Sequence, residues 1–312
     1  MRLTKPSRSN PRSVSVSIRC DTSGIARRIS ENRSAPSLLL PYRTIRKLFH
    51  KDAVVAENAS PIFRITPYIV FSAMALAAAI VPSLATDLPF AVAADAIALV
   101  GLFALARVFI ALAAMDLGTA FGSMGARREM FVGFLAEPAL LMVLFTASLI
   151  SGSTLLPTIV ETLAHREIAI YPSLAFAAVA FTMVSLAENA RIPVDNPATH
   201  LELTMIHEAM LLEYSARHLA LIEWAAALKL FNYWCIGLAL FFPYGIASAS
   251  DDWLAILVAT PVLIGKLAIG GFILALIETL SAKMRIFRAP EFLGTAFLLA
   301  VLGMLVNLLL GS

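Results

Sequence analysis

The sequence contains little charge and almost no cysteine. Of 312 residues only 14% are charged, whereas soluble globular domains carry about 25%, and 59% are hydrophobic. Water is therefore the wrong solvent for most of this chain. Cys20 lies in a polar tail and Cys235 in an apolar run, so a disulfide between them is not expected. Neither belongs to a cluster with iron–sulfur or zinc spacing.

The chain also lacks the short motifs of most enzyme classes. It has no nucleophile elbow, phosphate loop or dinucleotide fingerprint. His207-Glu208 resembles the start of the HExxH zinc motif, but position 211 is Leu, and a metal held by His200, His207 and a carboxylate is disfavoured. We therefore expect no catalytic residue, cofactor site or metal site in this chain.

What the sequence does contain is long apolar runs, each near 20 residues. Runs of this length are typical of membrane spans, and backbone groups in lipid must be satisfied within a helix. We therefore predict an all-α, polytopic transmembrane bundle. Its seven spans are expected at about residues 66–85, 93–115, 130–151, 169–187, 219–243, 253–281 and 291–310.

Two segments precede the spans. Residues 1–34 are rich in Arg and Ser and predict a disordered tail; an organellar transit peptide is the less favoured reading. Residues 35–312 are expected to form one membrane-embedded domain. Within it, Pro41 to Val55 places Ile45 and Leu48 on one face and basic residues on the other. This pattern predicts an amphipathic helix at an anionic membrane surface, or a basic flank of the first span.

Basic residues in the loops predict the orientation of the spans. With a cytoplasmic tail, the inner loops hold Arg127, Arg128, Arg191, Arg217, Lys283, Arg285 and Arg288. The outer loops then hold Arg166 and several acids. Because cytoplasmic loops carry an excess of Lys and Arg, we place the N-terminus and the loop 188–218 on the cytoplasmic side of the membrane. We expect this membrane to be a bacterial inner membrane. The net charge of +3 is explained in the same way and does not indicate a nucleic-acid partner.

Ionisable residues within the spans form a second predicted feature. Such residues are costly in lipid and usually face the bundle interior, where they pair. Asp95 and Glu278 lie near span ends and are expected to extend to the membrane surface. Either a proton or ion path or static ion pairs would explain the others, which are Arg107, Glu137, Glu223, Lys229 and Lys266.

The most highly charged stretch among the spans is residues 187–224. Such long loops are often functional. Glu188 and Arg191 are three residues apart, so we expect them to pair, and a short amphipathic helix is expected from about 197 to 214. We predict that the acids form a coupled proton-exchanging site or a docking surface for a soluble partner. The candidate residues of this loop are Glu188, Arg191, Asp195, Glu202, Glu208, Glu213 and Arg217.

Several long motifs in order resemble the family of H-type subunits of NADH-quinone oxidoreductase. They are PSLLLPYRTIRKL at 36–48, AENAS at 56–60, DLGTAFGSMGARREMFVGFLAEP at 116–138 and the stretch beginning AENARIPVD at 187. The sequence of this last motif is most similar to the hydrogenase branch of the family, which contains formate hydrogenlyase subunit 4 and the C component of hydrogenase 4. The resemblance implies eight spans, one of which would precede Pro36, where this chain has its polar tail.

The resemblance also implies a role. Members of this family join a soluble electron-transfer arm to antiporter-like membrane subunits, so the expected partners are hydrogenase-like and iron–sulfur subunits, antiporter-like subunits and the lipid bilayer. Nickel–iron and iron–sulfur centres would lie in the partners. The resemblance implies that the 188–213 acids line the region corresponding to the family's quinone cavity and that Glu137 belongs to a proton path. The leading hypothesis is a coupling subunit of a membrane-bound hydrogenase; the alternatives are a quinone-cavity subunit of a respiratory NADH dehydrogenase and a free-standing ion transporter.

Overall fold

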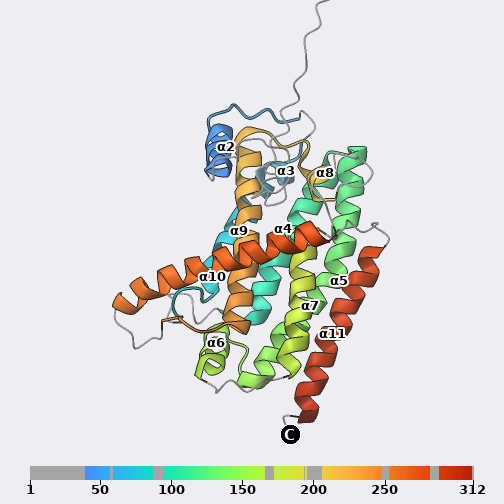
Figure 1. The fold of residues 1–312 in the computed structure, drawn as a ribbon. Coiled ribbons are helices and arrows are strands. Elements are labelled where there is room, and N and C mark those ends of the chain that lie inside the picture. The colour runs from blue at the N-terminus through green and yellow to red at the C-terminus, as the bar shows by residue number, and fades with distance from the viewer. Residues whose placement is uncertain are drawn as a thin grey trace, which may run out of the picture.

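The computed structural model describes residues 39–56, 59–86, 94–165, 172–192, 194, 206–247, 253–281 and 288–310. The described chain is a bundle of helices (Figure 1). The helices are α2 (Leu40–Phe49), α3 (Pro61–Ile80), α4 (Ala96–Asp116), α5 (Ala120–Ser151), α6 (Leu156–His165), α7 (Pro172–Glu188), α8 (His207–Leu211), α9 (Ala216–Phe241), α10 (Trp253–Leu280) and α11 (Ala289–Leu310). The predicted tail 1–34 lies outside the described residues.

Six of these helices are long and apolar enough to cross a membrane, namely α3, α4, α5, α9, α10 and α11. The predicted span at 169–187 corresponds to α7, which is apolar but only 17 residues long in its described part. The predicted polytopic helical bundle is therefore confirmed, and the chain is a multi-pass membrane protein.

Local signals explain where several helices begin. The Ser60 hydroxyl accepts a hydrogen bond from the backbone N–H of Ile62 at 3.1 Å, and Pro61 occupies the first position of α3. This combination is favourable because the hydroxyl accepts a hydrogen bond from an otherwise unpaired backbone N–H, and proline has no N–H that would need an acceptor. Asp95 accepts from the N–H of Ile97 at 2.9 Å and so caps α4.

Two helices differ from the sequence prediction. Helix α5 begins at Ala120, about ten residues before the predicted span, because the polar segment around Arg127 continues the helix beyond its apolar part. Helix α6 was not predicted, since residues 152–168 were assigned to an outer loop. It buries Leu156, Ile159 and Leu163, which share one helical face, so the periodic signal was present in the sequence.

The core lies between helices that run roughly side by side. Helix α4 packs between α3 and α5, α9 packs on α3, and α11 packs on α5 and α7. Aromatic rings fill the centre, where Tyr233 of α9 is 1% exposed and stacks on Phe103 of α4 with ring centroids 5.0 Å apart.

Helix α10 is an exception, because it crosses the other helices instead of running along them (Figure 1). Only 11% of its apolar window is buried within the protein. Contacts along its length attach it to the bundle: Lys266 donates to the carbonyls of Phe242 and Tyr244 beyond α9, Gly270 faces the ring of Trp234, and Glu278 pairs with Arg191. The absence of a side chain at Gly270 matters, since a Cβ there would lie 2.6 Å from Trp234.

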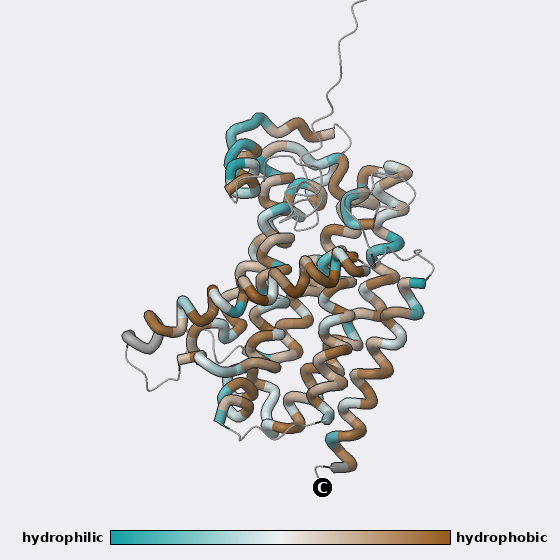
Figure 2. Tube along the Cα trace, viewed as in Figure 1, coloured by the Kyte–Doolittle hydropathy of each residue, from teal (hydrophilic) through white to brown (hydrophobic). Residues whose placement is uncertain are grey.

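Helix α2 confirms the predicted amphipathic helix, although it ends at Phe49 and not at Val55. Ile45 and Leu48 pack on Leu219 and Ala220 of α9. The basic residues of α2 are exposed on its other side. Figure 2 shows hydrophilic residues gathered at the end of the molecule that carries α2 and α8.

Candidate functional site

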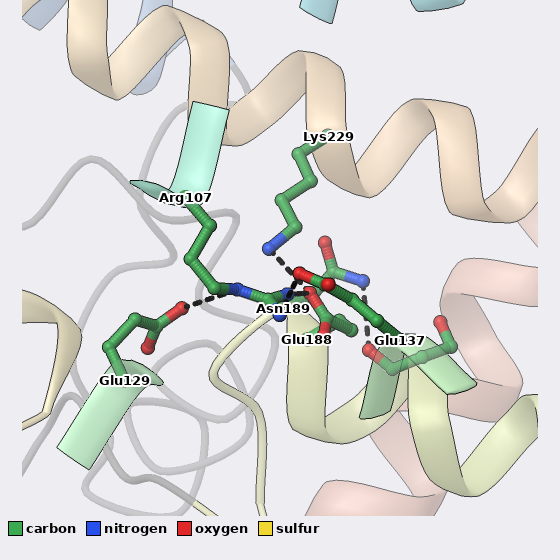
Figure 3. A network of polar contacts seen from close by, with 7 residues as sticks. Arg107, Glu129, Glu137, Glu188, Asn189 and Lys229 are labelled. Atoms are coloured by element: carbon green, nitrogen blue, oxygen red, sulfur yellow. Dashed lines mark hydrogen bonds and ion pairs between the residues drawn. The ribbon is translucent and has the colours of Figure 1, made fainter. Parts of the chain in front are cut away.

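A cluster of charged side chains lies inside the bundle and centres on Arg107 of α4 (Figure 3). Its guanidinium is 2.7 Å from the carboxylate of Glu137 on α5, contacts Glu188 at the end of α7, and lies 3.6 Å from Glu129 on α5. Lys229 of α9 also binds Glu188, at 2.8 Å. We call these five residues the Arg107 network; it joins four helices.

Glycine allows α5 to approach the network so closely. A Cβ on Gly133 would lie 2.0 Å from Nη1 of Arg107, which no real structure tolerates. Gly133 lies between Glu129 and Glu137 in the sequence, so the bare backbone faces the guanidinium while the two carboxylates bind it from either side.

We therefore expect Gly133→Ala to displace Arg107 and to destabilise the folded protein. Overpacking of a well-packed interior typically costs about 1–3 kcal/mol, and here the guanidinium would also lose its geometry with Glu137. Gly101→Ala on α4 is the matched control, since a Cβ there meets nothing within 4 Å. Thermal unfolding of both variants in detergent measures the difference. Equal midpoints for the two would show that the guanidinium moves aside at no cost.

Glu188 and Arg191 do not pair with each other, so that prediction is wrong. Helix α7 ends at Glu188, and Ala190 takes a left-handed conformation with φ of 49°, which turns Arg191 away. Glu188 instead binds Arg107 and Lys229, while Arg191 binds Glu278 of α10 at 3.1 Å. Glu278 is 6% exposed, so its predicted extension to the membrane surface is also wrong.

A cavity of about 420 Å³ opens beside the network. Arg107, Glu129, Glu188 and Lys229 lie in its wall, and apolar side chains of α3, α4, α9 and α10 form much of the rest. Glu137 is not among the lining residues. The network therefore connects the cavity, at Glu129 and Glu188, with the carboxylate of Glu137 about two turns further along α5.

The charges within these five residues do not balance. Two cations, Arg107 and Lys229, face three carboxylates, Glu129, Glu137 and Glu188, so full ionisation leaves one negative charge in excess. In addition, Oε1 of Glu188 has no hydrogen-bond partner among the described residues, although the side chain is 1% exposed. A buried carboxylate oxygen without a hydrogen bond is expensive in such surroundings, so the site at Glu188 favours binding of a proton, a water or a cation.

The remaining predicted residues divide between the cavity and other places. Glu208 of α8 and Glu223 of α9 line the cavity together with Arg191. Arg217 and Glu213 are exposed, and Lys266 binds backbone carbonyls at the far end of α9. Asp195 and Glu202 lie outside the described residues. Of the predicted helix at 197–214, the described part contains only α8, from His207 to Leu211.

Three residues of the site were missed from the sequence. Glu129 precedes Glu137 by eight residues, which is about two helical turns, so a longer α5 would have placed both on one face. Asn189, which follows Glu188 directly, also lines the cavity. Glu278 was interpreted as a residue near a span end; only its distant partner Arg191 reveals its role.

Outside the spans, Tyr214 links the loop before α9 to the bundle. Burial and the carboxylate of Asp116 raise the pKa of its hydroxyl above the usual value, so it stays protonated. It donates to the carbonyl of Phe63 at 3.2 Å, and the two rings stack 4.1 Å apart. The described residues contain no group of three His, Cys, Asp or Glu placed to hold a metal ion.

The bundle and its interior charges define a polytopic membrane protein with a polar network beside a cavity. Residues 17–309 match the sequence profile described as NADH dehydrogenase, and the chain belongs to this family, among its subunits of type 1 or H. This match confirms the resemblance inferred from the ordered motifs.

Two relatives come from Escherichia coli strain K12. The chain is 31% identical to formate hydrogenlyase subunit 4 over 273 residues, which is 88% of each chain. It is 36% identical to hydrogenase-4 component C over 228 residues, covering 72% of this chain and 71% of that one. Among solved structures, it resembles a chain of the membrane-bound sulfane sulfur reductase, an archaeal respiratory membrane complex, with a TM-score of 0.74 and 19% identity over 91% of this chain and 92% of that one. The latter likeness concerns the fold.

Proposed function

We propose that the chain is the membrane-anchoring and energy-coupling subunit of a membrane-bound nickel–iron hydrogenase or formate hydrogenlyase. The named relatives support the class of complex. The observation that carries the coupling role is the Arg107 network, because its buried Glu188 is shared by two cations and keeps one oxygen without a hydrogen bond among the described residues. The chain supplies no redox centre in this proposal, and electrons pass through partner subunits.

The proposed mechanism depends on the position of the network, which links the cavity wall at Glu188 with Glu137 on α5. A change in charge or shape at the cavity wall reaches Glu188, which shares Arg107 with Glu137. When Arg107 binds Glu188 more closely, Glu137 loses part of its neutralising partner and takes up a proton; the reverse movement releases it. The loop that follows Glu188 would face the cytoplasm and bind the soluble arm, while antiporter-like subunits receive the signal within the membrane.

The alternative function, a quinone-binding subunit of a respiratory NADH dehydrogenase, draws support from the cavity itself. A volume of about 420 Å³ is within the usual range for small-molecule sites, about 300–1,000 Å³, and its wall combines apolar side chains with a few charged ones. Hydrogen evolution by the purified complex, unaffected by added quinone or quinone-site inhibitors, would favour the hydrogenase. Quinone reduction would favour the alternative.

Glu137→Gln tests the coupling proposal in the native complex. The amide keeps the shape but cannot exchange a proton, so we expect hydrogen production to continue while ion uptake per hydrogen falls roughly tenfold or more. Glu188→Gln should have the same effect or release the soluble arm. The measurement is hydrogen evolution and ion uptake in sealed vesicles, with assembly checked by copurification of the partners.

Glu161→Gln is the matched control, because Glu161 is exposed on α6 and remote in sequence from the network. It should leave both rates unchanged. A normal ion-to-hydrogen ratio in both Glu137→Gln and Glu188→Gln would remove the coupling proposal but would leave the family assignment intact.

A further inference from the structure

A second charged site lies on the exterior of the helical bundle, at the end where α3 and α9 begin. Arg64 is in the first turn of α3 and Arg217 in the first turn of α9; both are exposed. Neither forms an ion pair with a carboxylate of the described residues. The two helix starts lie side by side, since the ring of Tyr68, four residues after Arg64, meets the ring of His218, which follows Arg217 directly. The Arg107 network does not use any of these side chains.

His218 itself has no hydrogen-bonding partner within the described part of the chain. It is 6% exposed, and its ring meets that of Tyr68 edge to face, with centroids 6.0 Å apart. A ring nitrogen without a hydrogen bond is available to a ligand, water or ion.

Below these charges, both helices present aromatic rings on the same faces. On α3, Arg64, Tyr68 and Phe71 follow at spacings of four and three residues, which places them on one stripe. On α9, Trp224 lies two turns below Arg217 on the corresponding stripe. The two stripes meet, since the rings of Phe71 and Trp224 lie 5.2 Å apart.

The resulting surface has cations at the helix starts and aromatic rings one to two turns further along the same helices. Two helix N-termini point to the same end and add a further positive field. Helix α2 also lies at this end and places Phe49 6.4 Å from Trp224. Cationic groups at one end and apolar rings at the other match an amphipathic anion with a charged headgroup and an apolar tail.

We propose that this surface binds the phosphate of an anionic phospholipid between Arg64 and Arg217. His218 donates a hydrogen bond to the same headgroup, and an acyl chain lies along Tyr68, Phe71 and Trp224. The bound lipid would fasten α2 and the starts of α3 and α9 at the membrane surface. This site is independent of the coupling proposal.

The test uses the full chain with whatever subunits copurify. Phosphatidylglycerol is titrated in mixed micelles, and binding is followed by native mass spectrometry and by the rise in unfolding temperature. We expect the double variant Arg64→Gln and Arg217→Gln to bind roughly 30-fold more weakly, because two basic contacts at an anionic surface are lost. The double lysine variant should keep most of the affinity, since lysine binds phosphate as a point charge.

Arg43→Gln with Arg46→Gln is the matched control, as it removes two exposed charges from the same end without changing the arginines or aromatic rings of α3 and α9. It should bind within about threefold of the wild type. An equal loss in this control would overturn the site in favour of a diffuse basic surface. An equal stabilisation by inorganic phosphate alone, or unchanged lipid binding by the double glutamine variant, would overturn it as well. If the double variant fails to assemble, the two single glutamine variants decide between the same outcomes.

Discussion

Arg107→Leu is expected to destabilise the folded protein more than any other single substitution in the network. Arg107 binds three carboxylates, and its removal leaves Glu129, Glu137 and Glu188 with Lys229 as the remaining cation of the network. Removing one partner of a buried ion pair typically costs about 3–5 kcal/mol, because the other charge stays buried and uncompensated. The midpoint of unfolding in detergent should therefore fall markedly.

The same reasoning predicts an order among the variants. Glu188→Gln leaves Arg107 with two other carboxylates, so its cost should be smaller than that of Arg107→Leu. Glu137→Gln should cost least, because that side chain is 30% exposed whereas that of Glu188 is 1% exposed. Arg127→Leu on α5 is the control; the side chain is exposed and the expected change is within about 0.5 kcal/mol. A smaller loss for Arg107→Leu than for Glu188→Gln would show that the network is not centred on the guanidinium.

A second substitution tests how strongly Glu188 depends on Arg107. Arg107→Leu combined with Glu188→Leu removes one charge of each sign, so the net charge of the network stays that of the wild type in a more apolar site. Double-mutant cycles give the coupling between the two directly, and a value near zero would mean that Lys229 alone neutralises Glu188.

The sequence predicted the helical bundle because apolar runs of membrane length have few alternatives in lipid. It located six of the seven spans to within a few residues at most ends. The start of α5 is the main exception, and it has a physical cause. This polar segment continues as helix because it packs on α8 through Gly125, where a Cβ would lie 2.9 Å from Ala209. That contact joins segments 84 residues apart, so local patterning could not reveal it.

The site was predicted in part. Ionisable residues within spans are rare, which indicates Glu137, Arg107 and Lys229, whereas Glu188 is a candidate because it lies in the charged loop; the structure brings these four together. Their partners could not be derived, since pairing depends on helix rotation and crossing. Lys266 satisfied the same criterion but binds the carbonyls of Phe242 and Tyr244, a solution that composition does not distinguish from an ion pair.

Breaking the pair between Arg191 and Glu278 should release the end of α10 from the bundle. The two side chains are 8% and 4% exposed, and their contact joins the segment after α7 to a helix that otherwise packs little on the bundle. Loss of a buried pair on the scale of about 3–5 kcal/mol would strongly favour states in which α10 moves away. Because α10 forms part of the cavity wall through Leu267 and Leu274, the cavity would open.

Labelling of a cysteine at position 274 measures this opening. Leu274 is 7% exposed in the intact protein, so Leu274→Cys should react slowly with a maleimide once Cys20 and Cys235 are replaced by alanine. We expect Arg191→Gln or Glu278→Gln to speed labelling roughly tenfold or more. Glu291→Gln, an exposed carboxylate on α11, should not change the rate.

The charge swap distinguishes a tether from mere loss of packing. Arg191→Glu combined with Glu278→Arg keeps both charges at the same contact with their signs exchanged, so slow labelling should return at least in part. Fast labelling in the swapped protein would mean that the other contacts of these two residues, and not their mutual attraction, hold α10 in place. Wild-type rates in both single variants would assign that role to Lys266 and Gly270, because those contacts remain at the other positions along the helix.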